Sequence, residues 1–270
     1  MSIDADHNAL GARDRLTEAA REAGRLALAY FRHGAATSAR INAKAGGSPV
    51  TEADLAVDAL LKTRLGEAFP EAGWLSEETA DDSDRLTRRA LIIVDPIDGT
   101  RAFVSGDPRW AISAALVVDG RPVAGVVHAP ALGETYAAAH GAGADLNGAP
   151  LAVSAPVDPR RLFAAGPKPI LQAMATKLGA TVEIAPRVPS LAYRLCMAAR
   201  GAIHFVIAAG NSHDWDVAAA DLILEEAGAR LVDASGERLT YNRPHVHRSP
   251  LLATPEAPRL LDAFRAAIGA

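Results

Sequence analysis

The chain has 270 residues, of which 49% are hydrophobic and 22% charged, and its formal net charge at pH 7 is −4. This length suits one large domain or two closely packed ones, and the acidic balance excludes an attraction to nucleic acid or to membrane surfaces. The N-terminus lacks the basic start and apolar core of a signal peptide, and no apolar run approaches the roughly 20 residues of a membrane helix. We therefore expect a cytoplasmic protein, and the single cysteine, Cys196, is compatible with a reducing compartment.

The first 70 residues predict two helices joined by a loop over residues 35–50. Apolar residues recur at helical spacing from about Leu10 to Phe31 and again from Leu55 to Phe69. Thr51 is a suitable N-cap for the second helix, and Asp54 stands three positions later, which resembles a capping box. Taken alone, Asp54 would be an ordinary carboxylate at a helix start, where the helix dipole favours it.

Acidic residues follow each of the next two predicted strands. Glu77 and Glu78 come directly after a short strand, Gly73–Ser76, and a buried strand, Leu91–Val94, runs into Asp95-Pro96-Ile97-Asp98-Gly99-Thr100. Because proline cannot continue a strand ladder and Asp-Gly indicates a turn, both aspartates should stand at the end of the strand. Open α/β sheets usually bind ligands there, although an ordinary turn would have the same sequence.

Beyond Thr100 the pattern changes to strands and short turns. Apolar runs over residues 111–118, 122–129 and 134–139 predict an antiparallel meander. After residue 158, strands (162–165, 181–184, 203–208, 251–253) alternate with helices (168–178, 190–199, 217–227, 256–268), with Ser190 and Asp216 placed as N-caps. We predict a layered α/β fold in which an N-terminal α+β half (1–155) and a C-terminal α/β half (156–270) form one catalytic unit.

Five carboxylates stand at element ends beside Gly, Pro or Trp, which is more than helix capping requires: Asp54, Glu77, Asp95, Asp98 and Asp216. Carboxylates that meet repel one another unless a proton or a cation lies between them. Oxygen ligands of this kind suit Mg²⁺. If the five side chains converge, we expect an all-oxygen site for two or three divalent cations.

Three motifs resemble the signatures of a known family. Glu77-Glu78, the hexapeptide Asp95–Thr100 and Trp215-Asp216-Val217-Ala218-Ala219 are similar in order and spacing to those of the inositol monophosphatase superfamily. Members are Mg²⁺-dependent, lithium-sensitive phosphomonoesterases, and the resemblance covers nearly the whole chain. It implies a five-layered αβαβα sandwich of the inositol monophosphatase/fructose-1,6-bisphosphatase type, an enzyme acting on a small phosphorylated metabolite, and a homodimer.

The resemblance also implies which residues hold the metal ions. Glu77 and Asp95, with the backbone carbonyl of Ile97, would hold the first Mg²⁺. Asp95, Asp98 and Asp216 would hold the second. One cation would then lower the pKa of the attacking water while the other stabilises the leaving oxygen.

The catalytic residues implied by the resemblance are Asp54, Thr100 and Glu77. Thr100 and Asp54 would orient and deprotonate a metal-bound water, and the backbone amides of Gly99 and Thr100 would hold the phosphate. This gives Asp54 a role beyond helix capping. A non-catalytic regulator on the same fold is the alternative from another class, but it would tolerate loss of residues that are all present here.

Three stretches look like the branch called CysQ, the 3′(2′),5′-bisphosphate nucleotidases: Lys44–Asp54, Leu75–Glu78 and Asp98–Phe103. The last differs from the usual pattern of that branch by Arg101 in place of Lys and Ala102 in place of Glu. Inositol monophosphatases carry a Glu seven residues before their last metal-binding Asp, where this chain has Ala209. The best guess for the substrate is thus a bisphosphate nucleotide, with inositol 1-phosphate and histidinol phosphate as alternatives.

A second phosphate would need basic partners, and Arg101, Arg109, Lys168 and Arg194 are the candidates. Each has an ordinary alternative as a solvated side chain or one packed along its aliphatic stem. His213 is close enough to Asp216 in sequence to line the same pocket. The predicted substrate-binding set is Lys44, Gly99, Thr100, Arg101, Lys168 and His213.

Overall fold

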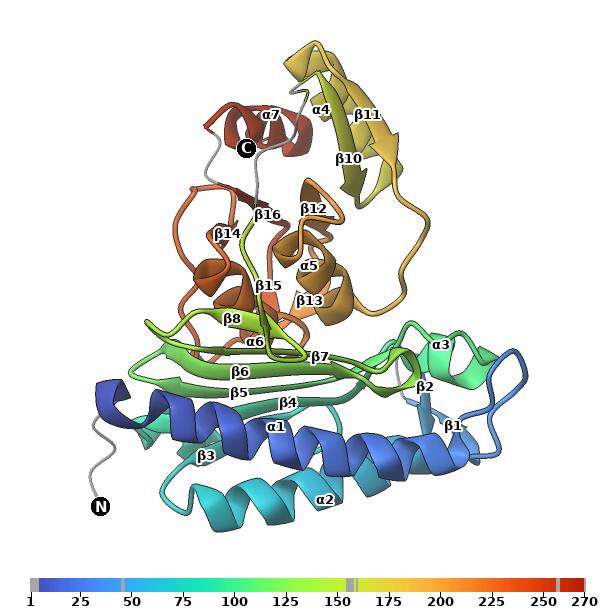
Figure 1. Cartoon of the computed structure of the whole chain (residues 1–270), viewed down its shortest axis with the longest axis vertical. Helices are drawn as coiled ribbons and strands as arrows, with labels where there is room; N and C mark the ends of the chain where they lie inside the picture. Colours follow the sequence, from blue (N-terminus) through green and yellow to red (C-terminus); the bar gives the residue numbers. More distant parts are fainter. Residues whose placement is uncertain (1–4, 45–46, 154–157, 159, 256–257, 270) are drawn as a thin grey trace.

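The computed structural model describes residues 5–44, 47–153, 158, 160–255 and 258–269, which fold into five alternating layers of helix and sheet (Figure 1). Two helices form the lowest layer in this view, a large sheet lies on them, two helices follow, and a smaller sheet and two more helices complete the stack. The predicted αβαβα sandwich is confirmed. The predicted boundary between the two halves, at residues 155 and 156, lies outside the described residues.

The outer helical layer consists of α1 (Ala5–Tyr30) and α2 (Glu52–Ala68). α1 buries Leu16, Ala20, Ala23 and Ala27, which recur every three or four residues and so share one helix face. The predicted capping box at the start of α2 is present. The predicted loop over residues 35–50 overlaps a short antiparallel hairpin of β1 (Ile41–Ala43) and β2 (Pro49–Thr51). The hairpin was not predicted because each strand has only three residues, too few for a periodic pattern to indicate a strand.

The large sheet has the strand order β3-β4-β5-β6-β7-β8-β9, in which only β3 and β4 are parallel. Its strands are β3 (Gly73–Ser76), β4 (Ala90–Asp98), β5 (Ala111–Val118), β6 (Arg121–Ala129), β7 (Glu134–Ala139), β8 (Ala144–Leu146) and β9 (Ala149–Pro150). Ser76 is in register with Val94, so the carboxyl ends of β3 and β4 lie at one edge of the sheet. Glu77 follows Ser76 and Asp95 follows Val94, so the parallel pairing brings Glu77 and Asp95 together.

The sequence predicted that β4 would end before Pro96, but the strand continues to Asp98. Asp95 pairs with Ser113 and Asp98 with Ala111, so the register shifts by one residue between the two aspartates. Bulges are among the few positions in a sheet where proline is tolerated. The extra residue re-aims the end of the strand, which is how two aspartates three positions apart come to face one site.

The middle layer contains α5 (Leu191–Ala199) and α6 (Asp214–Glu226), which pack between the two sheets in one continuous core. A short helix, α3 (Thr100–Ser105), follows Gly99 and was not predicted, because the Asp-Gly pair signals only a turn. Gly99 has φ +92°, a left-handed conformation that favours glycine.

The smaller sheet has the order β11-β10-β12-β16-β14, and α4 (Lys168–Leu178) and α7 (Pro258–Ile268) cover its outer face. Its strands are β10 (Arg161–Ala165), β11 (Thr181–Ile184), β12 (Phe205–Ala208), β14 (Ala229–Val232) and β16 (Leu251–Pro255). The remaining elements are β13 (Ser212–His213), β15 (His247–Arg248), and the 3-10 helices η1 (Ser83–Thr87) and η2 (Pro130–Leu132). None of the helices in the described part of the chain is long and apolar enough to cross a membrane.

Candidate active site

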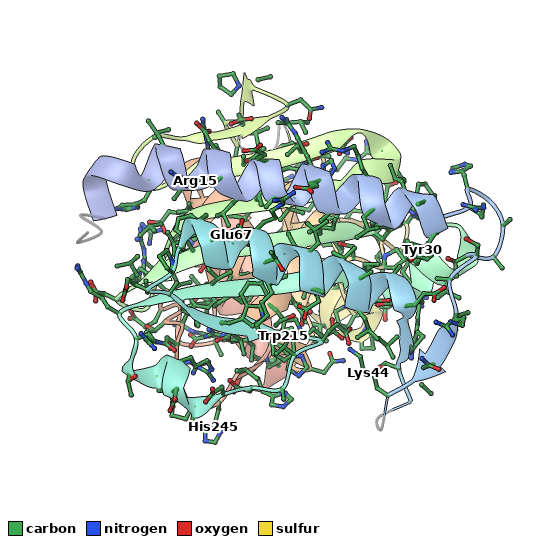
Figure 2. All side chains as sticks on the ribbon, turned by 90° about the horizontal axis from the view of Figure 1, so that it is seen from below. Arg15, Tyr30, Lys44, Glu67, Trp215 and His245 are labelled. Atoms are coloured by element: carbon green, nitrogen blue, oxygen red, sulfur yellow. The ribbon has the colours of Figure 1, made fainter. Side chains whose placement is uncertain are left out.

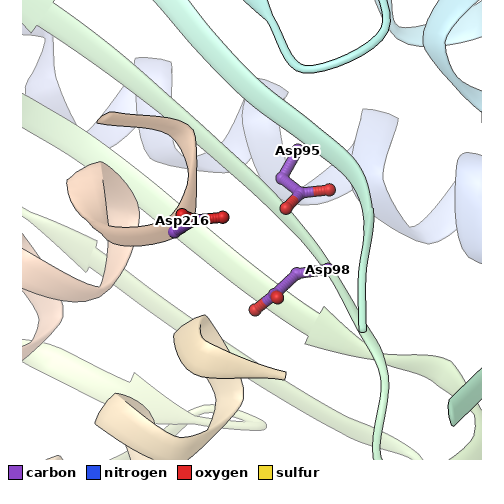
Figure 3. A group of neighbouring side chains, drawn as sticks. All are labelled: Asp95, Asp98 and Asp216. Atoms are coloured by element: carbon purple, nitrogen blue, oxygen red, sulfur yellow. The ribbon is translucent and has the colours of Figure 1, made fainter. Parts of the chain in front are cut away.

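Three aspartates from two distant parts of the chain converge between the sheet and the middle helices (Figure 3). Asp95 and Asp98 belong to the bulged end of β4, and Asp216 belongs to the first turn of α6. One carboxylate oxygen of each lies within 4.8 Å of the others. The structure thus brings together all three residues that were predicted for the second metal site.

Backbone and side-chain donors hold the two aspartates of β4. The amide of Ile97 donates to Oδ1 of Asp95 (3.1 Å). Oδ2 of Asp98 accepts from the hydroxyl of Ser190 and from the amide of Ala192, both at 2.6 Å. Ser190 is the N-cap of α5, as predicted, so Asp98 lies at the N-terminus of that helix, where the helix dipole favours a carboxylate.

Asp216 is not the N-cap of its helix, contrary to the prediction. α6 begins at Asp214 with His213 as the N-cap, and Asp216 is the third helical residue. Its Oδ2 accepts from the backbone amide of His213 (2.6 Å), as in the N3 half of a capping box. The first turn of α6 therefore contains two acidic residues, Asp214 and Asp216, and of these two only Asp216 belongs to the acidic cluster.

The cluster is electrostatically costly without a cation. Burial raises the pKa of Asp95 well above its ordinary value, and the charges of Glu77, Asp98 and Asp216 raise it further. Burial, followed by the charge of Asp216, raises the pKa of Asp98 to about 7, although its hydrogen bonds to Ser190 and Ala192 oppose this. A divalent cation would relieve the repulsion, and the donors are all oxygens, so these residues fit a hard cation such as Mg²⁺.

Glu77 lies at the adjoining edge of the sheet, where its charge acts on both Asp95 and Asp54. Lys44, predicted to bind substrate, donates to Oε1 of Glu77 and Oε1 of Glu78, each at 2.7 Å. Burial lowers the pKa of Lys44, but the hydrogen bonds to Glu77 and Glu78 and the charges of these two residues together outweigh it and leave that pKa raised. Burial also raises the pKa of Glu78 to about 7, against the lowering effect of Lys44.

Asp54 is buried and lies between two threonines. Its Oδ2 accepts from the amide (2.7 Å) and the hydroxyl (2.6 Å) of Thr51, and its Oδ1 accepts from the hydroxyl of Thr100 (3.2 Å). The Thr100 hydroxyl also lies 3.1 Å from the carbonyl oxygen of Ile97. Burial raises the pKa of Asp54, and the hydrogen bonds from Thr51 and Thr100 oppose that rise.

His213 flanks the cluster on the α6 side. Its ring stacks on Trp215, with centroids 4.5 Å apart and planes at 5°, and its Nδ1 lies 3.6 Å from Oδ2 of Asp216. His247 packs on the same imidazole at 4.3 Å. In the view onto the two outer helices, Trp215 and Lys44 both appear beyond the edge of α2 that faces away from α1 (Figure 2).

A pocket of about 320 Å³ opens where α5 and the end of β12 meet the loop that follows β11. It is lined by Ala165, Gly166, Pro167, Ile184, Ala185, Pro186, Arg187, Val188, Arg194 and Ala209. Arg194 lies one turn along α5 from Ser190, which binds Asp98, so the pocket adjoins the acidic cluster.

Arg194 is the predicted basic residue that this pocket contains. Its Nε is buried and has no hydrogen-bond partner among the described residues, while its Nη1 donates to the carbonyl of Val188 (3.3 Å). Burial lowers the pKa of Arg194, and the charge of Asp98 opposes this. Arg187 also lines the pocket and was missed, because a lone arginine in a loop carries no sequence signal.

The other predicted basic residues do not line this pocket. Arg101 and Lys168 are exposed, at the start of α3 and of α4. Arg109 is bound to Asp107 through Nη2 (2.5 Å) and donates to the carbonyl of Arg187 (2.8 Å). Arg109 therefore contacts the pocket wall at Arg187, whereas Arg101 and Lys168 are not among the lining residues, although Lys168 directly follows the lining residue Pro167.

This fold and this site belong to a known class. The model of the inositol monophosphatase family matches residues 12–268, and the chain is therefore a member of that family of metal-dependent phosphoric monoester hydrolases. The solved structure of the extragenic suppressor protein suhB from Bartonella henselae has a TM-score of 0.81 and 27% identity, and the match covers 95% of this chain and 98% of that chain.

Curated relatives have three different names. A histidinol-phosphatase of Chlorobaculum parvum is 41% identical, but the match covers only 51% of this chain and 51% of that protein. Inositol monophosphatase 2 of Solanum lycopersicum is 34% identical over 83% of this chain and 87% of that protein. The 3′(2′),5′-bisphosphate nucleotidase CysQ of Aggregatibacter actinomycetemcomitans is 30% identical over 84% of this chain and 86% of that protein. Similarity thus defines the reaction class and leaves the substrate open.

Proposed function

We propose that this protein hydrolyses a small phosphomonoester with Mg²⁺ held by Asp95, Asp98 and Asp216, together with Glu77 and the carbonyl of Ile97. The observation that carries the proposal is the convergence of two buried aspartates and one half-buried aspartate, whose mutual repulsion calls for a divalent cation. When bound, Mg²⁺ would supply a water of lowered pKa and charge stabilisation of the leaving oxygen.

The chain's own groups would move the proton and hold the phosphate. Asp54 is in position to accept the proton of the Thr100 hydroxyl, so that Thr100 can in turn take a proton from the attacking water. The amides of Gly99 and Thr100 precede and begin α3, where amides have no intrahelical acceptor, and would donate to the phosphate oxygens. Gly99 suits this turn because its φ of +92° lies in the left-handed region that favours glycine.

We further propose that the substrate is a 3′(2′),5′-bisphosphate nucleotide, which is converted to a 5′-nucleotide and phosphate. The adjoining pocket supports this choice, because it offers two arginines, of which Arg194 has an unused buried donor. A second phosphate would satisfy that donor with a charge-assisted hydrogen bond. Its apolar walls and its volume of about 320 Å³ suit part of a nucleoside.

The alternatives fit this pocket less well. Inositol 1-phosphate carries hydroxyls that need acceptors, and Ala209 provides none from its side chain. Histidinol phosphate, which the identity of 41% to a histidinol-phosphatase favours, carries an ammonium group that would face Arg187 and Arg194. A regulatory protein without activity is disfavoured because the acidic cluster and the Thr100–Asp54 pair are intact.

The deciding experiment measures phosphate release with Mg²⁺ from adenosine 3′,5′-bisphosphate, inositol 1-phosphate, fructose 1,6-bisphosphate and histidinol phosphate under identical conditions. We expect the highest kcat/KM for the bisphosphate nucleotide. A preference for either monophosphate would refute the nucleotide assignment and retain the phosphatase. No hydrolysis of any substrate by a folded, Mg²⁺-binding protein would refute the phosphatase assignment for these esters and favour the regulatory alternative.

A further inference from the structure

A buried ion pair, between Arg248 and Asp214, lies at the start of α6, the helix that presents Asp216. We infer that Arg248 is a positioning residue: through Asp214, it sets the place of Asp216 and thereby the affinity of the site for Mg²⁺. This inference rests on the proposed metal site. It concerns a part of the chain, β15 and the segment before it, to which the sequence motifs assign no function.

The contact between Arg248 and Asp214 is a buried ion pair. Nε of Arg248 donates to Oδ1 of Asp214 at 2.6 Å, and the side chains are 5% and 0% exposed. Oδ2 of Asp214 has no hydrogen-bond partner in the described part of the chain. Arg248 is therefore the side chain that holds this carboxylate, and a buried carboxylate without its partner would be strongly unfavourable.

Further contacts fix Arg248 itself. Its Nη2 donates to the carbonyl of Thr240 (2.9 Å), and its guanidinium lies 4.6 Å from the ring centroid of Tyr241. The Tyr241 hydroxyl in turn donates to Oδ2 of Asp221, two turns along α6 (2.8 Å). The segment 240–248 thus contacts α6 at two residues, Asp214 and Asp221.

The ion pair between Arg248 and Asp214 can affect the metal site because Asp214 lies in the same helical turn as Asp216. Asp214 and Asp216 are the first and third residues of one helical turn. β13 pairs with β15 immediately before this turn, with Ser212 opposite Arg248, and the amide of Asp214 donates to the carbonyl of Val246 (2.9 Å). A shift of Asp214 would move Asp216 with it.

Mg²⁺ is sensitive to such a shift. It requires near-octahedral geometry at oxygen distances of about 2.0–2.1 Å, so a small displacement of one carboxylate weakens binding. Residues that orient metal ligands typically change metal affinity by about 10–100-fold when they are replaced. We expect Arg248 to act in this range, although it contributes no atom to the site.

The test is calorimetric binding of Mg²⁺ to the substrate-free protein. Arg248→Met should weaken Mg²⁺ binding at least about 10-fold, and Arg248→Lys, which restores the charge, should recover part of the affinity. Arg238→Met is the matched control, because Arg238 pairs with Glu225 at the exposed far end of the same helix. It should leave the Mg²⁺ dissociation constant within about 2-fold of wild type.

Unfolding by denaturant, with and without Mg²⁺, separates positioning from general stability. If Arg248→Met lowers stability but binds Mg²⁺ like wild type, the inference is wrong. If that variant does not fold, Asp214→Asn and Arg248→Lys carry the same test, and unchanged Mg²⁺ binding in both would overturn it. Asp95→Asn is run in parallel: retention of Mg²⁺ binding there would mean that the proposed metal site itself is wrong, whatever Arg248 does.

Discussion

The hydroxyl of Thr100 donates to Oδ1 of Asp54 over 3.2 Å, across 46 positions of the chain. The bond joins the first turn of α2 to the first turn of α3, which begins two residues after the end of β4. Thr51 occupies the other carboxylate oxygen of Asp54, so the acceptor that faces Thr100 is held in one orientation. This fixed relay of hydroxyl and carboxylate is what a proton acceptor beside the acidic cluster requires.

Removing the hydroxyl of this relay should reduce turnover and spare metal binding. We expect Thr100→Ala to lower kcat by about 100-fold or more while the calorimetric Mg²⁺ affinity stays near wild type, because the role proposed for Thr100 is to carry a proton. Thr63→Ala is the control, since that hydroxyl bonds only the Ala59 carbonyl on the exposed side of α2. A loss of Mg²⁺ affinity equal to the loss of kcat would contradict the assigned role.

Arg194 should select for a second anionic group on the substrate. Arg194→Gln should raise KM for adenosine 3′,5′-bisphosphate by about 10-fold or more, because a charge-assisted bond is lost, and change KM for a simple phosphomonoester little. Lys177→Gln removes an exposed cation from the last turn of α4 and should leave both KM values unchanged. Equal effects of Arg194→Gln on both substrates would show that this arginine only supports the fold.

The backbone at Gly99 should not tolerate a side chain. Its φ is +92°, and an added Cβ would lie 3.1 Å from the amide nitrogen of Ser190. Gly99→Ala should therefore lower the free energy of unfolding by about 1–3 kcal/mol and disturb the Asp98–Ser190 contact. Gly66→Ala, in α2 with open space around it, should instead stabilise by up to about 1 kcal/mol. Denaturant titrations of both variants check the contrast.

Asp221 should make stability fall as pH rises toward neutrality. Burial raises its pKa from 3.8 to about 7, against the hydrogen bond from Tyr241, so the folded state binds a proton that the unfolded state releases. The resulting stabilisation is full below about pH 4 and is lost as pH passes about 7, by up to about 4 kcal/mol. Urea titrations from pH 4 to 8 should show a flatter profile for Asp221→Asn. If the pH profile of stability were the same for Asp221→Asn as for wild type, Asp221 would not be the group whose titration changes the stability.

Local physical chemistry determined much of this protein. Helical spacing predicted α1 and α2, the Thr51–Asp54 capping box was visible in four consecutive residues, and Ser190 was recognised as an N-cap. Runs of apolar residues indicated the central strands. These features depend on neighbours within a few positions, so the sequence contains them, and the motif resemblance added the order of layers.

Some errors were local as well. Asp216 was placed as the N-cap of α6, but His213 takes that position because the helix starts three residues earlier, at Asp214. β4 was expected to end before Pro96, whereas a bulge admits the proline and extends the strand to Asp98. In both cases the local signal allows more than one backbone path, and contacts with β13, β15 and β5 select between them.

The sequence alone determined that this chain carries acidic residues and a threonine in the pattern of a metal-dependent phosphatase. Only the tertiary structure decided which basic residues accompany them. It paired Lys44 with Glu77 and Glu78, left Arg101 and Lys168 in solvent, and brought Arg187 and Arg194 to one pocket. It also joined Arg248 to Asp214. Such pairs are separated in the chain by turns and whole elements, so their distances follow from packing of the layers, which no local pattern encodes.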